Sequence, residues 1–174
     1  ERSSKKSRGA PAMVVYRDIK PEMKQAVAAI SHTATTGSDL CLNSITNGSQ
    51  YFERIGAKIK IWNVEYWLFE SGGVPVTLKV DMYLGDTTTD FATHTLAASF
   101  PRQKYTLLKT IVATPGGTPN QDGVYGNHRL PVGVVSRYNA STGASLVDNA
   151  INVRIQTSSA TSISGYFRIW YTDA

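Results

Sequence analysis

The sequence contains a single cysteine, Cys41, so no disulfide bond can form within the chain. Leu40 and Leu42 flank this residue, and an apolar neighbourhood favours a buried, inert thiol over a reactive one. A domain of 174 residues can bury roughly two-thirds of the surface of its unfolded chain, so it needs neither a disulfide nor a metal ion to fold. The length therefore predicts one ordinary domain, with or without a tail.

Long apolar segments are also missing. No run approaches the roughly 20 residues that cross a bilayer, so we expect no membrane-spanning helix and no membrane partner. The N-terminal residues lack the apolar stretch of a secretory signal. Because the chain begins with Glu1 rather than Met, we expect that its start was processed or that further residues precede it.

Signatures of catalysis are absent as well. Gly116-Gly117-Thr118 lacks the Gly-Lys-Ser/Thr that would complete a phosphate-binding loop, and no Gly-x-Ser-x-Gly turn occurs. The histidines lack metal-ligand spacing, and we expect each to be a surface or hydrogen-bonded residue. They are His32, His94 and His128. Three carboxylates close in sequence are interpreted as solvated turn ends rather than a catalytic pair. They are Asp81, Asp86 and Asp90. The sequence therefore predicts that the protein is not an enzyme.

The positive charge is concentrated at one end of the chain. The net charge is +5. Residues 1–24 carry seven basic and three acidic side chains, which gives +4, whereas the other 150 residues carry eleven basic and ten acidic ones, which gives +1. The basic residues of the first segment are Arg2, Lys5, Lys6, Arg8, Arg17, Lys20 and Lys24.

Residues 1–12 combine this charge with Ser, Gly and Pro and have almost no large apolar side chains. Such a segment buries too little surface to offset the entropy of ordering it, which predicts a disordered arm. A terminal basic arm beside a domain without catalytic groups favours nucleic-acid binding over mere solubility. The seven basic residues would neutralise phosphates and release counterions, without reading bases.

From about residue 25 the sequence is typical of β-structure. Val, Ile, Thr, Tyr and Trp dominate short runs, which Gly, Asn, Asp and Pro separate, and no long helical pattern occurs. Strands are expected at 25–30, 39–43, 58–70, 76–84, 105–113, 130–138, 150–157 and 165–171. Eight strands without helices predict an all-β sandwich or barrel, with long polar connections at 85–103 and 114–128 that serve contacts.

The run 58–70 begins with alternating apolar and polar residues and then becomes apolar at every position. This pattern fits a strand with water on one side that passes into a sandwich or an interface. The aromatic residues of interest are Trp62, Tyr66, Trp67, Phe69 and Tyr105. We expect most of them in the core, with some left to anchor subunit contacts.

Four stretches together resemble a known family. They are Arg54-Ile55-Gly56 before the long strand, Tyr105–Thr110, Arg129–Ala140, and Tyr171-Thr172-Asp173-Ala174 at the C-terminus. In order and spacing they resemble the coat proteins of the satellite tobacco necrosis virus type, a jelly-roll family that also includes capsid proteins of many small circular single-stranded DNA viruses. The segments 85–103 and 139–149 depart from this resemblance.

The resemblance implies a fold and a function. Residues 25–174 would form one eight-stranded jelly roll of two four-stranded antiparallel sheets, and residues 1–24 would form a basic N-terminal arm. Sixty copies would build a T=1 icosahedral shell around a single-stranded RNA or DNA genome. The protein would reside in the virion and assemble inside the host cell, in the nucleus if the genome is DNA. The host receptor stays open.

Two alternatives accompany this interpretation. Shells of the resembled family can carry calcium between subunits, and the resemblance points to Glu22 and Asp173 as carboxylate ligands; both would otherwise be ordinary surface carboxylates. No other cofactor is expected. The second alternative concerns the function: a non-viral jelly-roll binding module, either lectin-like or a binder of single-stranded nucleic acid.

Overall fold

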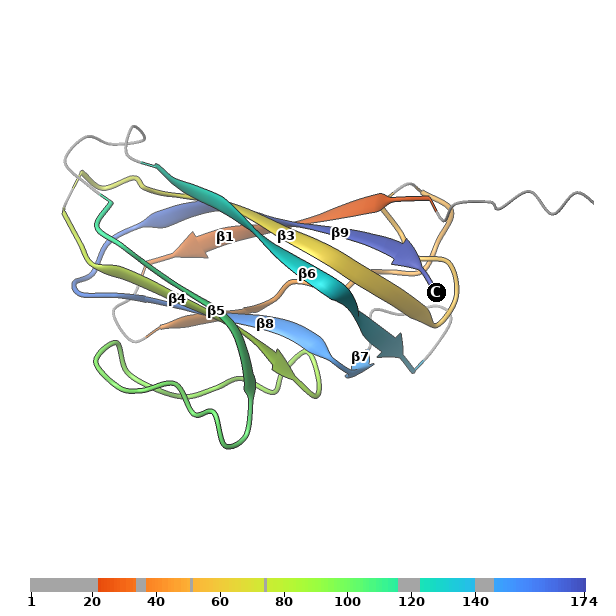
Figure 1. The fold of residues 1–174 in the computed structure, drawn as a ribbon. Coiled ribbons are helices and arrows are strands. Elements are labelled where there is room, and N and C mark those ends of the chain that lie inside the picture. The colour runs from red at the N-terminus through yellow and green to blue at the C-terminus, as the bar shows by residue number, and fades with distance from the viewer. Residues whose placement is uncertain (1–21, 34–36, 51, 74, 116–122, 140–145) are drawn as a thin grey trace, which may run out of the picture.

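The computed structural model describes residues 22–33, 37–50, 52–73, 75–115, 123–139 and 146–174, and every regular element among them is a strand. Figure 1 shows their arrangement. No helix in this part of the chain is long and apolar enough to cross a membrane. The strands are β1 Lys24–His32, β2 Ser38–Cys41, β3 Lys58–Glu70, β4 Leu78–Gly85, β5 Thr106–Ala113, β6 Gly123–Tyr138, β7 Leu146–Asp148, β8 Ala150–Thr157 and β9 Ile163–Asp173.

The strands form two antiparallel sheets, with the orders β1-β9-β3-β6-β7 and β2-β8-β4-β5. The first strand pairs with the last, β2 with β8, β3 with β6, and β4 with β5. A chain paired in this nested way behaves as a long ribbon wrapped into two sheets, which is the jelly-roll arrangement. The predicted all-β jelly roll is confirmed, except that one sheet has five strands because the three-residue β7 adds to β6.

The core lies between the two sheets, where alternate residues of each strand meet. In β3 the inward residues Ile59, Ile61, Val64 and Leu68 have no exposed surface. Burying each such side chain stabilises the fold by about 1.5–3 kcal/mol relative to leaving it in water. Because the phase of β3 is fixed by this buried set, its remaining side chains must point away from the core.

The connection between β4 and β5 packs against the outer face of the four-stranded sheet, where it is drawn in green below β4 and β8 (Figure 1). Tyr83 of β4 forms a second, small apolar cluster with Ala92, Phe100 and Tyr105. The Asn152 amide donates to the carbonyls of Thr87 and Asp90. Every residue of β8 is consequently buried, because the sheet is covered on both faces.

A buried polar group attaches this connection to the sheet. His94 Nε2 lies 2.8 Å from Asp81 Oδ2, Lys79 Nζ lies 3.5 Å from the same oxygen, and the Thr110 hydroxyl donates to Asp81 Oδ1. Asp81 has no exposed surface. Its interpretation as a solvated turn end is therefore wrong, because the carboxylate lies in the middle of β4 beneath the connection.

Two of the three histidines are hydrogen-bonded, as predicted. Besides His94, the buried ring of His32 contacts the Ser38 hydroxyl at 2.6 Å and the Thr157 hydroxyl at 3.2 Å. Burial lowers the pKa of His32. A neutral ring that exchanges hydrogen bonds with two hydroxyls is a structural residue that joins β1 to β8.

Candidate assembly and nucleic-acid interfaces

Six of the seven basic residues predicted to bind nucleic acid lie outside the described residues. They are Arg2, Lys5, Lys6, Arg8, Arg17 and Lys20. The seventh, Lys24, is the first residue of β1 and is buried. Its Nζ lies 2.7 Å from Asp173 Oδ2 and donates to the Glu53 carbonyl at 3.0 Å. A phosphate would have to displace this carboxylate, so we leave Lys24 out of the proposed nucleic-acid contacts.

The motif Arg54-Ile55-Gly56 is structural. The Arg54 guanidinium is fully buried, lies 3.9 Å from the centre of the Tyr138 ring, and donates to the carbonyls of Ile45 and Gly56. A cation over an aromatic face with its N–H groups satisfied is a stable buried arrangement. Arg54 thereby fixes the segment between β2 and β3 against the end of β6.

The two carboxylates predicted to bind calcium are placed differently. Asp173 uses Oδ2 for Lys24 and accepts a hydrogen bond from the Ile55 N–H at Oδ1, at 2.7 Å. Glu22 is exposed. Within the described part of one chain, no three His, Cys, Asp or Glu side chains are grouped to hold a metal ion. Calcium takes six to eight oxygen ligands, so the described residues of one subunit do not supply a site by themselves, and the prediction depends on further ligands, such as those of a second copy.

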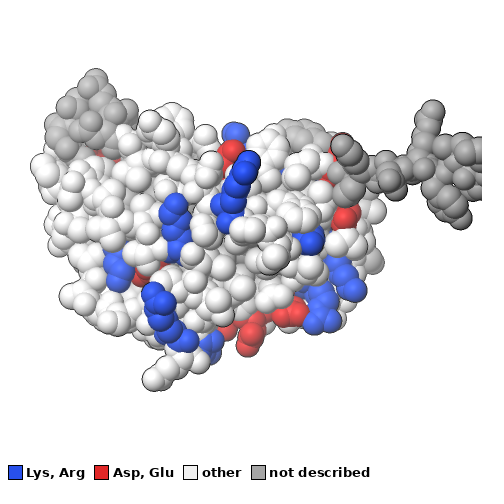
Figure 2. Space-filling view, viewed as in Figure 1, with Lys and Arg blue, Asp and Glu red and all other residues white. Residues whose placement is uncertain are grey.

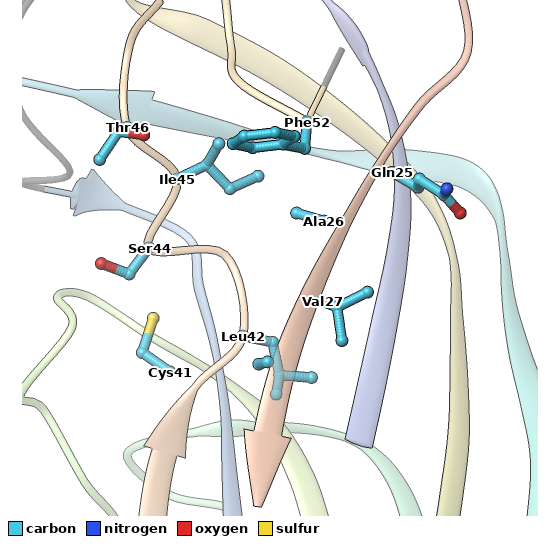
Figure 3. Close-up of a pocket in the computed structure, with 10 residues that line it drawn as sticks. Gln25, Ala26, Val27, Cys41, Leu42, Ser44, Ile45, Thr46 and Phe52 are labelled. Carbon is cyan, nitrogen blue, oxygen red and sulfur yellow. The ribbon is translucent and has the colours of Figure 1, made fainter. Parts of the chain in front are cut away.

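An apolar recess opens along the free edge of β1. It has a volume of about 510 Å³ and lies between β1 and the segment that follows β2. Figure 3 shows Ala26, Leu42, Ile45 and Phe52 around this space. None of its lining residues is charged. Val27 and Phe52 are each about half exposed, at 58% and 46%. No strand in the described part of the chain pairs with the outer side of the nine-residue β1, and an uncharged recess beside such an edge is a surface suited to contact with another protein chain.

The outer face of the five-stranded sheet carries a group of aromatic side chains. The inward phase of β3 is buried, so Trp67 and its neighbours across the sheet point outward. Trp67 is paired with Tyr125 of β6 on one side and with Tyr166 of β9 on the other. The aromatic residues of this face are Trp62, Trp67, Phe69, Tyr125, Tyr166 and Trp170. We call them, together with the cations described next, the aromatic–basic face.

Basic side chains lie among these rings. They are Lys58, Lys60, Arg129, Arg137 and Arg168. Two acidic residues belong to the same surface, and each is beside an arginine: Asp148 Oδ2 lies 2.5 Å from Arg137 and Glu65 Oε2 lies 3.5 Å from Arg168. Five cations against two carboxylates give an excess of three positive charges. Figure 2 shows Lys and Arg side chains spread over the side of the molecule toward the viewer, which includes β6 and also the region of β4 and β5.

The aromatic–basic face is hollowed in two places. One depression of about 660 Å³ is lined by residues that include Trp67, Tyr125 and Tyr166. The second, of about 450 Å³, is lined by residues that include Trp62, Arg129 and Trp170. Glu65 lines both, so the two depressions adjoin along the sheet.

The sequence did not identify this face as a unit. The prediction that most aromatic residues lie in the core holds for Tyr66 and Tyr105, which are buried, whereas Trp67 is 47% exposed. The change within 58–70 from alternation to apolar residues on both phases did signal an interface as one alternative. Tyr125 lies in a segment expected to be a loop, so its pairing with Trp67 could not be foreseen.

No protein-family model and no curated protein matches the sequence. Among solved structures, the chain is similar to the capsid of cyanophage Pam1, with a TM-score of 0.39, 8% identity, and coverage of 100% of this chain and 98% of that one. It is also similar to infectious bursal disease virus Gt strain, with a TM-score of 0.35, 15% identity, and coverage of 96% and 37%. A third similar structure is the xylanase 10B CBM22-1–GH10 modules of Clostridium thermocellum, with a TM-score of 0.30, 10% identity, and coverage of 85% and 26%. Viral capsids are thus among the similar structures, but similarity at this level assigns no family to the chain.

Proposed function

We propose that this chain is the coat protein of a small icosahedral virus. Sixty copies assemble into a closed T=1 shell and package a single-stranded genome through the basic N-terminal segment. The observation that carries the proposal is a jelly roll whose first strand combines an edge that no described strand pairs with, an uncharged apolar recess, and a direct covalent link to residues 1–23, which carry six basic and three acidic side chains, a charge of +3.

The edge supports self-association for a physical reason. Among the described residues, the nine-residue β1 has no neighbour on one side. Such an edge exposes unpaired N–H and C=O groups, which isolated proteins protect with charges, proline or bulges. β1 has no charged residue after Lys24, no proline, and neighbouring apolar residues that remain accessible. A closed shell covers such an edge on every subunit at once.

The second candidate function is a jelly-roll module that binds single-stranded nucleic acid without forming a shell. The aromatic–basic face favours it, because exposed rings among cations would suit such a ligand in a monomer as well as in a capsid. The two functions differ in particle mass.

Sedimentation velocity and electron microscopy of the purified chain test the proposal. A shell of sixty 19.0 kDa subunits has a mass of about 1.1 MDa before nucleic acid is added. Deletion of residues 1–12, which removes Arg2, Lys5, Lys6 and Arg8, should leave the jelly roll folded and lower the ratio of absorbance at 260 nm to that at 280 nm. A monomer or dimer at low salt would overturn the shell and favour the binding module; full nucleic-acid content after the deletion would overturn the role of the arm.

A further inference from the structure

We propose that the aromatic–basic face is a second nucleic-acid site, on the folded domain itself, which stacks the bases of a single strand. This inference deepens the proposed packaging function and rests on it. It differs from the contact of the arm, which would neutralise phosphates without touching bases.

Accessibility distinguishes the two sheets. The outer face of the four-stranded sheet lies beneath the β4–β5 connection, where Arg154, Gln156 and Asn152 are bonded to its carbonyls. The five-stranded sheet has no such cover within the described residues. Trp67 is 47% and Tyr125 is 81% exposed, so a large part of each ring stands in water although Trp67 also contacts Phe69 and Tyr166. An exposed aromatic group of this kind marks a binding surface.

The rings are arranged in a row across three adjacent strands. The register places Tyr166, Trp67 and Tyr125 directly opposite one another on β9, β3 and β6. Strands lie about 4.8 Å apart, so the row spans about 10 Å, which is enough for two bases in succession. Tyr166 meets Trp67 edge to face, with centroids 5.9 Å apart. This contact fixes the Trp67 ring while its remaining surface stays open.

A glycine makes room for the central ring. A Cβ atom at Gly123 would lie 2.6 Å from Trp67 Nε1, so the indole extends over the backbone of β6 at this position. Gly123 is the first residue of β6 and lies opposite Phe69. The position of the Trp67 indole therefore depends on the missing side chain at Gly123.

The charge of the face suits a polyanion. Arg168 lies 5.4 Å from the centre of the Tyr166 ring, and Lys60 lies 4.3 Å from that of Trp62. Cations beside rings allow a base to stack while its phosphate is neutralised. Glu65 would repel a phosphate, but Arg168 lies beside it. The excess of three cations remains for the backbone of the ligand.

Polar atoms on the same surface lack partners. Asn63 Oδ1, Trp170 Nε1 and Arg168 Nε are shielded from solvent and have no hydrogen-bond partner among the described residues. Asn63 and Trp170 face each other in the register of β3 and β9. Because these atoms are shielded, a ligand does not reach them as the side chains stand, and the exposed rings and cations carry the recognition. A duplex keeps its base faces stacked internally, so these features select a single strand.

Ultraviolet cross-linking of the full chain to oligothymidine and oligouridine of about 16 nucleotides tests the inference directly. We expect cross-linked peptides that contain Trp67 or Tyr125, in addition to those from the arm. In fluorescence anisotropy, Tyr125→Ala and Trp67→Ala should each weaken single-strand binding roughly 5- to 100-fold without changing the salt dependence. Arg129→Ala should lower the salt slope by about 0.7. Val112→Ala, at a position on β5 that is 65% exposed and so lies between Trp67 and Tyr125 in exposure, is the matched control and should change neither quantity.

Several outcomes would overturn the inference. They are cross-links confined to residues 1–21, unchanged affinity of Tyr125→Ala, equal binding of a duplex of the same length, and competition by the neutral sugar maltohexaose. If Trp67→Ala does not fold, Tyr125→Ala decides, because its side chain is almost free. Particles of full mass without these cross-links would reject the second site and keep the shell, whereas cross-links without particles would reject the shell and keep the site.

Discussion

Cys41 lies at the end of β2 with its sulfur 3.4 Å from Asn43 Oδ1. Burial raises the pKa of its thiol to about 11. At pH 8 the thiolate fraction is then roughly two hundred times smaller than that of a free cysteine. Cys41 is half-buried rather than fully buried as predicted, and its low reactivity remains a prediction.

We therefore expect slow reaction of Cys41 with a thiol reagent such as 5,5′-dithiobis(2-nitrobenzoate) in the native protein. The rate should rise roughly tenfold per pH unit up to pH 9.5, because only the thiolate reacts. The same chain in urea should react at the rate of a free cysteine. Fast native labelling at pH 7 would contradict the raised pKa.

Gly165 fixes the distance between β9 and β3. Its φ is +139°, and a Cβ atom there would overlap the carbonyl oxygen of Trp67. Gly56 also has a positive φ, +85°, but nothing lies within 4 Å of its missing Cβ atom. A substitution at Gly56 therefore has only the energetic cost of the backbone conformation, whereas a substitution at Gly165 has that cost and a steric clash as well.

Gly165→Ala should lower the free energy of unfolding by about 3 kcal/mol or more, since both costs apply. Gly56→Ala should lower it by about 1 kcal/mol, since only the conformational cost applies. Urea unfolding followed by tryptophan fluorescence measures both. Equal losses in the two variants would show that β9 can move away from Trp67.

At the scale of elements, the β4–β5 connection depends on Asp81. This carboxylate is fully buried and receives hydrogen bonds or ion pairs from three side chains of different segments: Lys79, His94 and Thr110. Removing one member of such a group leaves the others buried and unpaired, and that loss outweighs the small net contribution of each bond.

Asp81→Ala should therefore destabilise the domain by roughly 2–4 kcal/mol. It should also increase hydrogen exchange in 92–100, the segment that His94 and Phe100 hold against the sheet. Asp86→Asn, in the exposed part of the same connection, is the control and should change stability by less than about 0.5 kcal/mol. Unchanged exchange in 92–100 after Asp81→Ala would show that the apolar cluster alone holds the connection.

Most elements could be predicted from residue pattern, and the exceptions have physical causes. The strand expected at 58–70 is β3 without any change of boundary, because its alternation and β-branched content are strong. β6 begins at Gly123 rather than at residue 130. Gly123, Gly126 and Asn127 have low β-propensity, and only pairing with β3 makes this segment a strand. β7 is too short to have a pattern.

The aromatic–basic face was less predictable than the sheets. Apolar residues at both the inward and the outward positions of a strand indicate that both faces of the sheet are covered. They do not show whether the outer face is covered by another part of the same chain or by a ligand. In β8 the second cover is the β4–β5 connection, whereas over Trp67 no described residue supplies one. The polar composition of 85–103 gave no sign that this connection packs against the sheet. Phe100 and Tyr105 are enough to anchor it there.

At the scale of the molecule, the recess beside β1 should be part of the contact between subunits. Val27→Asp places a charge there at a position 58% exposed, so the fold should be kept. Association would then have to desolvate the carboxylate, and we expect a loss of 1.1 MDa particles in sedimentation velocity, corresponding to about 2 kcal/mol or more per contact. Val112→Asp, 65% exposed on β5, is the matched control. Loss of particles only in the control would place the contact on the opposite edge.

Calcium binding at subunit contacts remains a prediction, and the ion pair between Lys24 and Asp173 suggests how to test it. Asp173 is neutralised by Lys24 within one chain, so calcium would have to compete with an ammonium group 2.7 Å away or use an exposed carboxylate such as Glu22 of another copy.

If calcium binds there, a chelator should lower the melting temperature of particles, and Asp173→Asn should abolish that response. Lys24→Met frees the carboxylate and should instead strengthen the response to calcium, because the competing cation is gone. A melting temperature that does not change with chelator in either the natural chain or Lys24→Met would remove Glu22 and Asp173 as metal ligands. Asp173 would then serve only to join β9 to β1 and to the N–H of Ile55.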